Sequence, residues 1–384
     1  MKQHLPLKIF SFFLLLLLIA IGIFLARNKP IWNDEIYSQT ESIEQKTYAD
    51  ILLGKVAEGN NCPLFYILQK AITQVLQYDF PDGWEGRWSI YHPESQMILR
   101  IIPIFFISLS IICIFYFFAK NTSFVWGMIS LFISLSTYMV WLYWAEARPY
   151  PLWFFFSTIQ YLRILHIVKN GKVEDNDLKI LMVVHIFMAL TSVLSIAQIF
   201  IVCIFLWMMG ERKKLNYLWI IGLPLVFCLY YYSRAPKYEF WFDFAPIRLI
   251  TEALPLEQMV LIVGYAVVAS LFYFFKKDWI SINENKDQMV FVAFVMFILL
   301  EAFSLLGVLI LKDCGGPQGF ALSSRYFVFL SPLGIIAASF FSYEIFKLSK
   351  KNLWIVTNVI IVLAGFIILR AIKTFIHLFD VGLF

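Results

Sequence analysis

Residues 7–26 read LKIFSFFLLLLLIAIGIFLA, an apolar run of 20 residues in which Lys8 carries the only charge. A helix of about 20 mostly apolar residues is long enough to cross the hydrocarbon core of a bilayer. The following residues, LARNKPIWNDE at 25–35, lack the small-residue cleavage site of a secretory signal peptide. We therefore expect the run to stay in the chain as a signal anchor and to form its first transmembrane helix.

Apolar runs of similar length recur along the whole chain. Of the 384 residues, 61% are hydrophobic and 15% are charged, a balance that is not typical of a water-soluble domain. The runs predict about eleven transmembrane helices, at residues 7–26, 97–118, 123–143, 150–168, 178–194, 196–210, 215–233, 258–275, 289–311, 325–346 and 353–374. Only serine and threonine residues within 191–195 separate the fifth run from the sixth, and merging the two would reverse the side of every later loop. The expected fold class is all-α, a single polytopic membrane domain over residues 1–384.

Basic residues in the short loops predict the orientation of the chain, because lysine and arginine there prefer the cytoplasmic side. Lys2 and Lys8 place the N-terminus inside. The loops then predicted inside contain Lys120, Lys169, Lys172, Lys179, Arg212, Lys213, Lys214, Lys276, Lys277, Lys347, Lys350 and Lys351. The net charge of +5 is therefore interpreted as a topology signal and as contact with anionic membrane lipids, not as a nucleic-acid-binding surface.

The first outer loop, residues 27–96, is the longest segment predicted outside the membrane. Residues 63–77 predict an amphipathic helix lying on the membrane surface, with a cap at residues 60–61 and a proline in the first turn. Its predicted apolar face contains Leu64, Leu68, Ala71, Ile72, Val75 and Leu76, and its polar face contains Gln69, Lys70, Thr73, Gln74 and Gln77. Residues 43–56 show a weaker pattern of the same kind. Such surface helices suit a protein that handles a lipid-borne substrate.

Two charged motifs are predicted on the outer side. The first is WNDEIY at 32–37, just after the first span, and the second is EARPY at 146–150, between the third and fourth spans. Adjacent carboxylates can act as a base or as metal ligands, but acidic residues are also common in the first turn of a helix. The second motif can also be an interfacial belt in which Glu146 pairs with Arg148.

Two arginines at helix ends are predicted on the same side. Arg100 opens the second span and Arg325 opens the tenth. A guanidinium can bind a phosphate through paired hydrogen bonds, but a long basic side chain at a helix end can also simply extend to the headgroups. Both interpretations stay open.

In this order the motifs resemble those of the polyprenyl-phosphate-sugar-dependent glycosyltransferases of the GT-C superclass. The resemblance is to bacterial relatives of the dolichyl-phosphate-mannose protein mannosyltransferases, of the aminoarabinose-transferase-like kind. The matching positions are the Asp-Glu pair 34–35, the helix start 61–66, Arg100, the turn 146–150 and an Arg-Tyr-to-Pro pattern at 325–332. The resemblance covers residues 7–346, and the chain departs from it at 61–62, where Asn-Cys replaces the family's His-Pro.

The resemblance implies an inverting membrane glycosyltransferase of GT-C type on the outer, periplasmic face of a bacterial plasma membrane, with residues 27–96 forming part of the active site. Asp34 and Glu35 would be catalytic, with Asp34 as the base. Donor and substrate contacts would come from Glu146, Arg148, Tyr150, Arg100, Arg325, Tyr326, Tyr37 and Tyr66. The implied partners are a polyprenyl-phosphate-linked sugar, a glycan, lipid or protein acceptor, and membrane lipids, without nucleic acid. Some family members use a divalent cation, and the resemblance leaves Mg²⁺ or Mn²⁺ on Asp34, Glu35 and Glu146 open.

Glu301 lies in the middle of the ninth predicted span, where a carboxylate is either functional or protonated and hydrogen-bonded inside the bundle. The functional interpretation points to a different class of protein. An intramembrane carboxylate is typical of transporters, so a lipid or solute transporter that uses Glu301 is the main alternative. A non-catalytic relative and a ligase or polymerase of lipid-linked polysaccharide assembly are the others. Cys62 and Cys314 are both predicted outside, where a disulfide between them is one option that the sequence leaves open. The triplet DND at 175–177 is interpreted as solvated loop charge.

Overall fold

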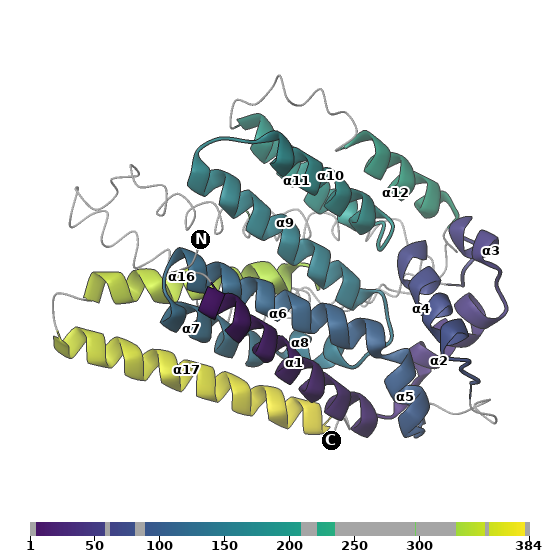
Figure 1. The fold of residues 1–384 in the computed structure, drawn as a ribbon, viewed down its shortest axis with the longest axis horizontal. Helices are drawn as coiled ribbons and strands as arrows, with labels where there is room; N and C mark the ends of the chain where they lie inside the picture. The colour runs from purple at the N-terminus through teal and green to yellow at the C-terminus, as the bar shows by residue number, and fades with distance from the viewer. Residues whose placement is uncertain are drawn as a thin grey trace, which may run out of the picture.

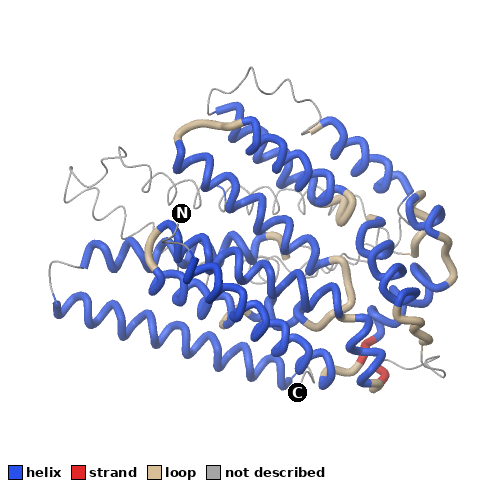
Figure 2. Tube along the Cα trace, viewed as in Figure 1, coloured by secondary structure: helices blue, strands red, loops and turns tan. Residues whose placement is uncertain are grey.

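The computed structural model describes residues 5–57, 62–80, 89–208, 221–234, 296, 328–349 and 353–380. Within these ranges helix accounts for 82% of the residues and strand for 2%, which confirms the prediction of a helical fold (Figure 2). Buried apolar side chains from Leu14 to Phe341 belong to one main cluster. The helices therefore pack around a shared core.

Two helices in the described part of the chain are long and apolar enough to cross a membrane, α1 (Leu5–Asn28) and α6 (Ile101–Asn121). A third such span exists if α7 (Phe124–Leu135) and α8 (Tyr138–Trp144) count as one, although they are bent by 70° at their junction. These apolar helices indicate a membrane-associated protein. The count of eleven remains a prediction, because two of the predicted runs, apart from Met296, lie outside the described residues.

The other long helices are α9 (Tyr150–Asn170), α10 (Asp175–Ala189), α11 (Ser195–Met208), α12 (Gly222–Arg234), α16 (Leu330–Ser349) and α17 (Leu353–Asp380). Helices α10 and α11 are separate, as the division between the fifth and sixth runs predicts. The interpretation of DND as solvated loop charge is wrong for its last residue. Asp177 lies in the first turn of α10, is 1% exposed and pairs with Arg163 at 2.5 Å between Oδ1 and Nη2.

The long helices run roughly side by side along the long axis of the molecule (Figure 1). The short elements that follow α1 gather at one end of this bundle, where α6 and α9 begin, whereas the N-terminus and the α9–α10 connection lie toward the opposite end (Figure 1). Loops predicted on opposite sides of the membrane thus lie at opposite ends of the bundle. Which end faces the cytoplasm remains a prediction.

Short elements fill the described part of the loop between α1 and α6. They are β1 (Ile31–Trp32), α2 (Asn33–Gln39), the π-helix η2 (Thr40–Glu44), α3 (Tyr48–Leu52), α4 (Pro63–Val75), β2 (Ser89–Ile90) and α5 (Pro93–Leu99). Strand β1 pairs antiparallel with β2, with Ile31 opposite Ile90, so the loop closes back on its own start. The amphipathic helix predicted over 43–56 is wrong in extent, since only the five residues of α3 are α-helical there.

The helix predicted after Pro63 is confirmed as α4, but its cap is not the predicted one. The N-cap residue is Cys62, whose side chain makes no capping hydrogen bond. Instead, the backbone N–H groups of Cys62 and Leu64 donate to the carbonyl oxygens of Thr191 and Leu190 at 3.2 and 2.8 Å. The carbonyls left over at the end of α10 thus satisfy the first N–H groups of α4.

The buried side chains of α4 include two from the face that the sequence predicts to be polar. Gln69 and Thr73 are buried, and the Gln69 Nε2 donates to the carbonyl oxygen of Leu99 at 2.9 Å. Val75 and Leu76 at the end of the helix are 81% and 46% exposed. The predicted helix on the membrane surface would leave its polar face to water, whereas the hydrogen bond of Gln69 directs part of that polar face into the protein. The exposed end of the apolar face suits contact with lipid, whereas Leu64, Leu68 and Ile72 of the same face pack partly against the core.

The predicted third span is interrupted at Ser136 and Thr137, between α7 and α8. Helix α17 binds this break with two side chains. Arg370 Nη2 donates to Thr137 Oγ1 at 3.1 Å, and Thr374 Oγ1 donates to the Ser136 carbonyl oxygen at 2.9 Å. A bend in a helix frees backbone carbonyls, and in an apolar surrounding these need partners from a neighbouring helix. Residues of α17 therefore hold the bend from which α8 leaves.

Side chains of α6 and α8 pack tightly against α1 at Gly22. A Cβ atom at this position would lie 2.9 Å from Ile104 Cγ2 and 2.9 Å from Trp144 Nε1. Trp144 is fully buried and its Nε1 donates to Ser108 Oγ at 3.0 Å. Glycine is thus required for the close approach of α1 to the helix that precedes EARPY.

Gly22→Ala is expected to destabilise the protein by about 1–3 kcal/mol, the usual range for overpacking a core. The added methyl group must displace either Ile104 or the indole of Trp144. The measurement is the midpoint of thermal unfolding of the purified protein in detergent. The matched control is Gly365→Ala in α17, where a Cβ atom meets nothing within 4 Å. An unchanged midpoint for Gly22→Ala would contradict the tight contact.

Candidate active site

The Asp-Glu pair lies in the first turn of α2, directly after β1. Successive residues of a helix point about 100° apart, so the two carboxylates have different surroundings. The Glu35 side chain is 1% exposed, whereas that of Asp34 is 26% exposed. One member of the pair is therefore an interior group and the other is open to a substrate.

Glu35 forms a paired ion bridge with Arg100, which lies in the break between α5 and α6. Arg100 Nε donates to Oε1 at 2.8 Å and Nη2 donates to Oε2 at 2.6 Å. The remaining N–H groups of Arg100 donate to the carbonyl oxygens of Ala26, Lys29 and Pro30 at the end of α1. A guanidinium has five N–H donors, and all five are used within the protein. Arg100 is fully buried and leaves no donor for a phosphate.

Glu35 also binds the EARPY turn. The Ala147 N–H donates to Glu35 Oε1 at 2.7 Å, and the Trp32 N–H donates to Oε2 at 3.3 Å. Burial alone raises the pKa of Glu35, but the charge and hydrogen bonds of Arg100, the charge of Lys29 and the Ala147 N–H hold that pKa below its usual value of 4.5. The ionised Glu35 thus joins α1, α2, the start of α6 and the turn.

Arg148 of the same turn contacts the exposed member of the pair. Its Nη1 donates to the Asp34 carbonyl oxygen and to Ser38 Oγ, each at 3.0 Å. Its Nη2 lies 3.8 Å from Asp34 Oδ2, and the guanidinium lies 5.7 Å from the centre of the Tyr150 ring. Arg148 is 6% exposed. The sequence separates these groups by more than a hundred residues, and the fold places a carboxylate and a guanidinium side by side at the edge of the site.

Lys29 and Glu146 form a second buried ion pair beside the first. Lys29 Nζ lies 3.6 Å from Glu146 Oε2 and donates to the Leu142 carbonyl oxygen at 3.4 Å. Burial lowers the pKa of Lys29 and raises the pKa of Glu146, in each case against the opposite charge of the partner. Lys29, Asp34, Glu35, Arg100, Glu146 and Arg148 are called the charged cluster below.

Sequence reasoning brought Asp34, Glu35, Arg100, Glu146 and Arg148 to one side of the membrane, and the structure brings them into one cluster. It missed Lys29, whose only signal is its position immediately after the first apolar run, and Ser38, one helical turn after Asp34. In sequence, a lysine at that place cannot be told from an ordinary basic residue facing the headgroups.

The predicted tyrosines have different positions. Tyr37 is 40% exposed on α2, close in sequence to Asp34. Tyr150 is buried, with its ring 5.1 Å from that of Tyr143, and Tyr66 is fully buried in α4. Other predicted residues lie outside the described part of the chain, namely Arg325, Tyr326, Glu301 and Cys314. The option of a disulfide between Cys62 and Cys314 therefore stays open, because Cys314 is one of these residues.

Two carboxylates of the charged cluster, Glu35 and Glu146, do not fit a divalent cation. Mg²⁺ and Mn²⁺ need several free oxygen ligands, yet both oxygens of Glu35 accept from N–H groups and Glu146 faces Lys29. Among the described residues, no three His, Cys, Asp or Glu side chains are grouped so that they could share an ion.

The charged cluster combines a partly exposed carboxylate with an adjacent guanidinium on a framework of buried ion pairs. Such a carboxylate can accept a proton, and such a guanidinium can stabilise an anion. No protein-family model matches the chain, and no curated protein matches it in sequence.

Proposed function

We propose that the protein is a membrane glycosyltransferase that moves a sugar from a polyprenyl-phosphate donor to an acceptor hydroxyl, with inversion at the anomeric carbon, on the outer face of the plasma membrane. The acceptor oxygen forms a bond to the anomeric carbon while the bond from that carbon to the phosphate oxygen breaks. The hydroxyl proton goes to Asp34, and the electron pair of the broken bond leaves with the phosphate.

The observation that carries the proposal is the difference between Asp34 and Glu35. Asp34 is 26% exposed and lies beside Arg148, whereas Glu35 is 1% exposed with both oxygens bound to Arg100 and to backbone N–H groups. A base must be able to reach the hydroxyl that it deprotonates, and Asp34 meets this condition. Glu35 is assigned as a positioning residue, in place of the catalytic role that the resemblance implies for it.

Arg148 is the described residue that suits the leaving phosphate. Its Nη2 is directed toward Asp34, so an anion at this edge would lie near both the base and a positive charge. Arg100 has all five donors bound within the protein and serves, with Glu35, to hold α1, α2 and the EARPY turn. Arg325 and Tyr326 keep the donor contacts that the resemblance implies for them.

A lipid-linked donor is favoured by the orientation of α4. This helix belongs to the same loop as Asp34 and directs Val75 and Leu76 outward, with exposures of 81% and 46%. A sugar phosphate carried on a polyprenyl chain has its reactive carbon at the membrane surface, and an outward apolar face keeps the loop at that depth. The resemblance, the charged cluster and α4 therefore support the same substrate class.

Arg148→Lys is expected to slow sugar transfer by about 10²-fold or more. Removing one preorganised hydrogen-bond donor that stabilises a developing negative charge has an effect of this size in other enzymes. Lysine keeps the charge but not the fork of N–H groups that spans Asp34, Ser38 and the anion. The rate is measured as the amount of glycan product formed per amount of membrane-inserted protein. Arg27→Lys, an exposed arginine at the end of α1, is the control and should leave the rate unchanged. Equal rates for both variants would remove Arg148 from the site.

The function itself is tested by mass spectrometry of envelope glycolipids, polysaccharides and glycoproteins from cells with the gene, without it, and with it restored on a plasmid. We expect one sugar-sized mass increment to vanish on deletion and to return on restoration, and the increment identifies the sugar and the acceptor. Unchanged glycans in the deletion strain, with a lipid or solute that no longer crosses the membrane, would instead support the transporter.

A further inference from the structure

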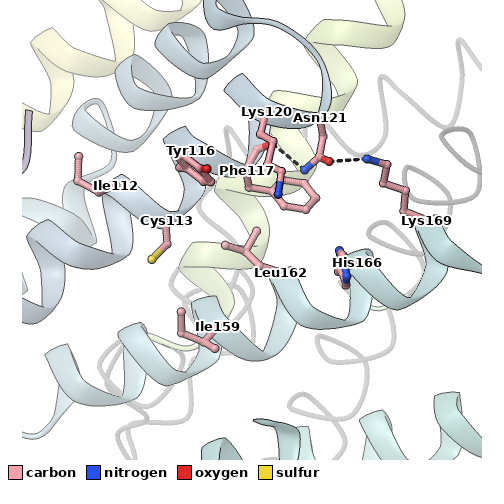
Figure 3. A pocket seen from close by; sticks show the side chains of 10 residues that line it. All are labelled: Ile112, Cys113, Tyr116, Phe117, Lys120, Asn121, Ile159, Leu162, His166 and Lys169. Atoms are coloured by element: carbon pink, nitrogen blue, oxygen red, sulfur yellow. Dashed lines mark hydrogen bonds between the residues drawn. The ribbon is translucent and has the colours of Figure 1, made fainter. Parts of the chain in front are cut away.

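A cavity of about 360 Å³ lies between α6 and α9, near the C-terminal ends of both helices (Figure 3). Its volume falls in the range of small-molecule sites, about 300–1,000 Å³. The two helices begin at the end of the bundle that holds the charged cluster, so the cavity lies toward the opposite end (Figure 1). It is separate from the proposed active site.

The cavity is apolar at one end and cationic at the other. Ile112, Ile159 and Leu162 line the apolar part, whereas Lys120 and Lys169 lie where both helices end (Figure 3). Lys169 Nζ donates to Asn121 Oδ1 at 2.7 Å. Two ammonium groups from different helices thus lie near one opening, and Lys120 is exposed there.

The length of the cavity follows the helix axes. From Ile112 to Asn121 is nine residues along α6, which corresponds to about 13 Å. In a membrane-embedded bundle this direction runs from the headgroup level toward the middle of the bilayer. A ligand that matches the cavity therefore carries a negative charge at one end and an apolar chain at the other.

We infer that this cavity binds an anionic phospholipid, with the phosphate between Lys120 and Lys169 and one acyl chain along Ile112, Ile159 and Leu162. Basic pockets between transmembrane helices on the cytoplasmic side are known to select such lipids. The predicted orientation places both lysines on the cytoplasmic side, where anionic lipids are enriched. The inference does not rest on the proposed glycosyltransferase activity.

The experiment measures lipid binding to the purified full chain in detergent by native mass spectrometry. The probes are phosphatidylglycerol and phosphatidylcholine with identical oleoyl chains. We expect the wild type to retain phosphatidylglycerol at least tenfold better than phosphatidylcholine. Lys120→Gln/Lys169→Gln should lose this preference, and the matched control Lys172→Gln/Lys179→Gln, two exposed lysines at the same end of the bundle, should keep it.

A second variant tests the acyl chain without changing the charge. Leu162→Trp fills the apolar part of the cavity and should reduce retention of both phospholipids. If the double lysine variant does not fold, Leu162→Trp still tests whether a lipid occupies the cavity. Inorganic phosphate at millimolar concentration should not displace phosphatidylglycerol. The inference is overturned if both double variants bind phosphatidylglycerol equally, which means that the lysines only extend to the headgroups, or if Leu162→Trp has no effect.

Discussion

Asp34→Asn is expected to fold and insert normally but to transfer sugar about 10²- to 10⁴-fold more slowly, the range attributed to a positioned general base. Asparagine has the size of aspartate, but its amide cannot take the proton of the attacking hydroxyl at neutral pH. The fold should tolerate the change because the Asp34 side chain is 26% exposed. Its Oδ2 lies 3.8 Å from Arg148 Nη2, which is too long for a hydrogen bond that asparagine would break. The Asp34 carbonyl that binds Arg148 is part of the backbone and is kept.

The control for this variant is Asp79→Asn, which removes an exposed carboxylate from the same outer loop. Both variants are compared with the wild type at equal amounts in the membrane, by the mass increment of the glycan product. Full activity of Asp34→Asn would mean that another group is the base, and the assignment of Asp34 would have to be abandoned. Loss of activity in both variants would point to a general effect of loop charge instead.

Glu35→Gln and Arg100→Gln are each expected to destabilise the protein by about 3–5 kcal/mol, the typical result of removing one partner from a buried ion pair. In Glu35→Gln, Arg100 keeps its charge with no carboxylate to neutralise it. In Arg100→Gln, the carbonyl oxygens of Ala26, Lys29 and Pro30 lose their donors. The double variant should lose less than the sum of the two single variants, because the remaining partner is then also uncharged.

This prediction is checked by unfolding in detergent, with Lys55→Gln as control. Lys55 pairs with Asp50 at 3.0 Å, but its side chain is 59% exposed, so its loss should change the unfolding free energy by about 0–1 kcal/mol. The stability that Glu35 contributes should also depend on pH. Because its pKa in the folded state lies below the usual 4.5, that stability is present above this value and is lost as the pH falls through the folded pKa. Equal effects of Glu35→Gln and Lys55→Gln would contradict the structural role.

Much of the site was predictable from residue types and from the alternation of loops. Placing Asp34 and the turn 146–150 on the same side required only the count of the first three apolar runs. What the sequence could not reveal was which of two adjacent acids faces inward. That choice depends on the phase of a short helix and on Arg100, which is distant in sequence. The same limit applies to Arg100. The sequence allowed it either to bind a phosphate or to extend to the lipid headgroups, whereas in the structure all five of its N–H groups donate to groups within the protein.

The positions of helices could be predicted where the packing follows the local apolar pattern. They could not be predicted where one hydrogen bond between distant residues determines the orientation or the bend of a helix. The runs that became α1, α9, α10 and α11 were placed to within a few residues. The burial of Gln69 on α4 could not be predicted, because the carbonyl oxygen that it binds belongs to Leu99 at the end of α5. The third run is bent because Ser136 and Thr137 find partners on α17, and no local pattern within the run contains that information.

The bend between α7 and α8 has a consequence for the synthesis of the protein. Arg370 follows Thr137 by 233 residues, and a ribosome adds about 5–20 residues per second, so the bond that holds the bend can form only about 12–47 s after Thr137 is made. Helix α8 leads directly into the turn that carries Arg148. In the nascent chain the turn that carries Arg148 can already bind Glu35 and Asp34, whereas the bend that leads into it gains its two partners on α17 only at the end of translation.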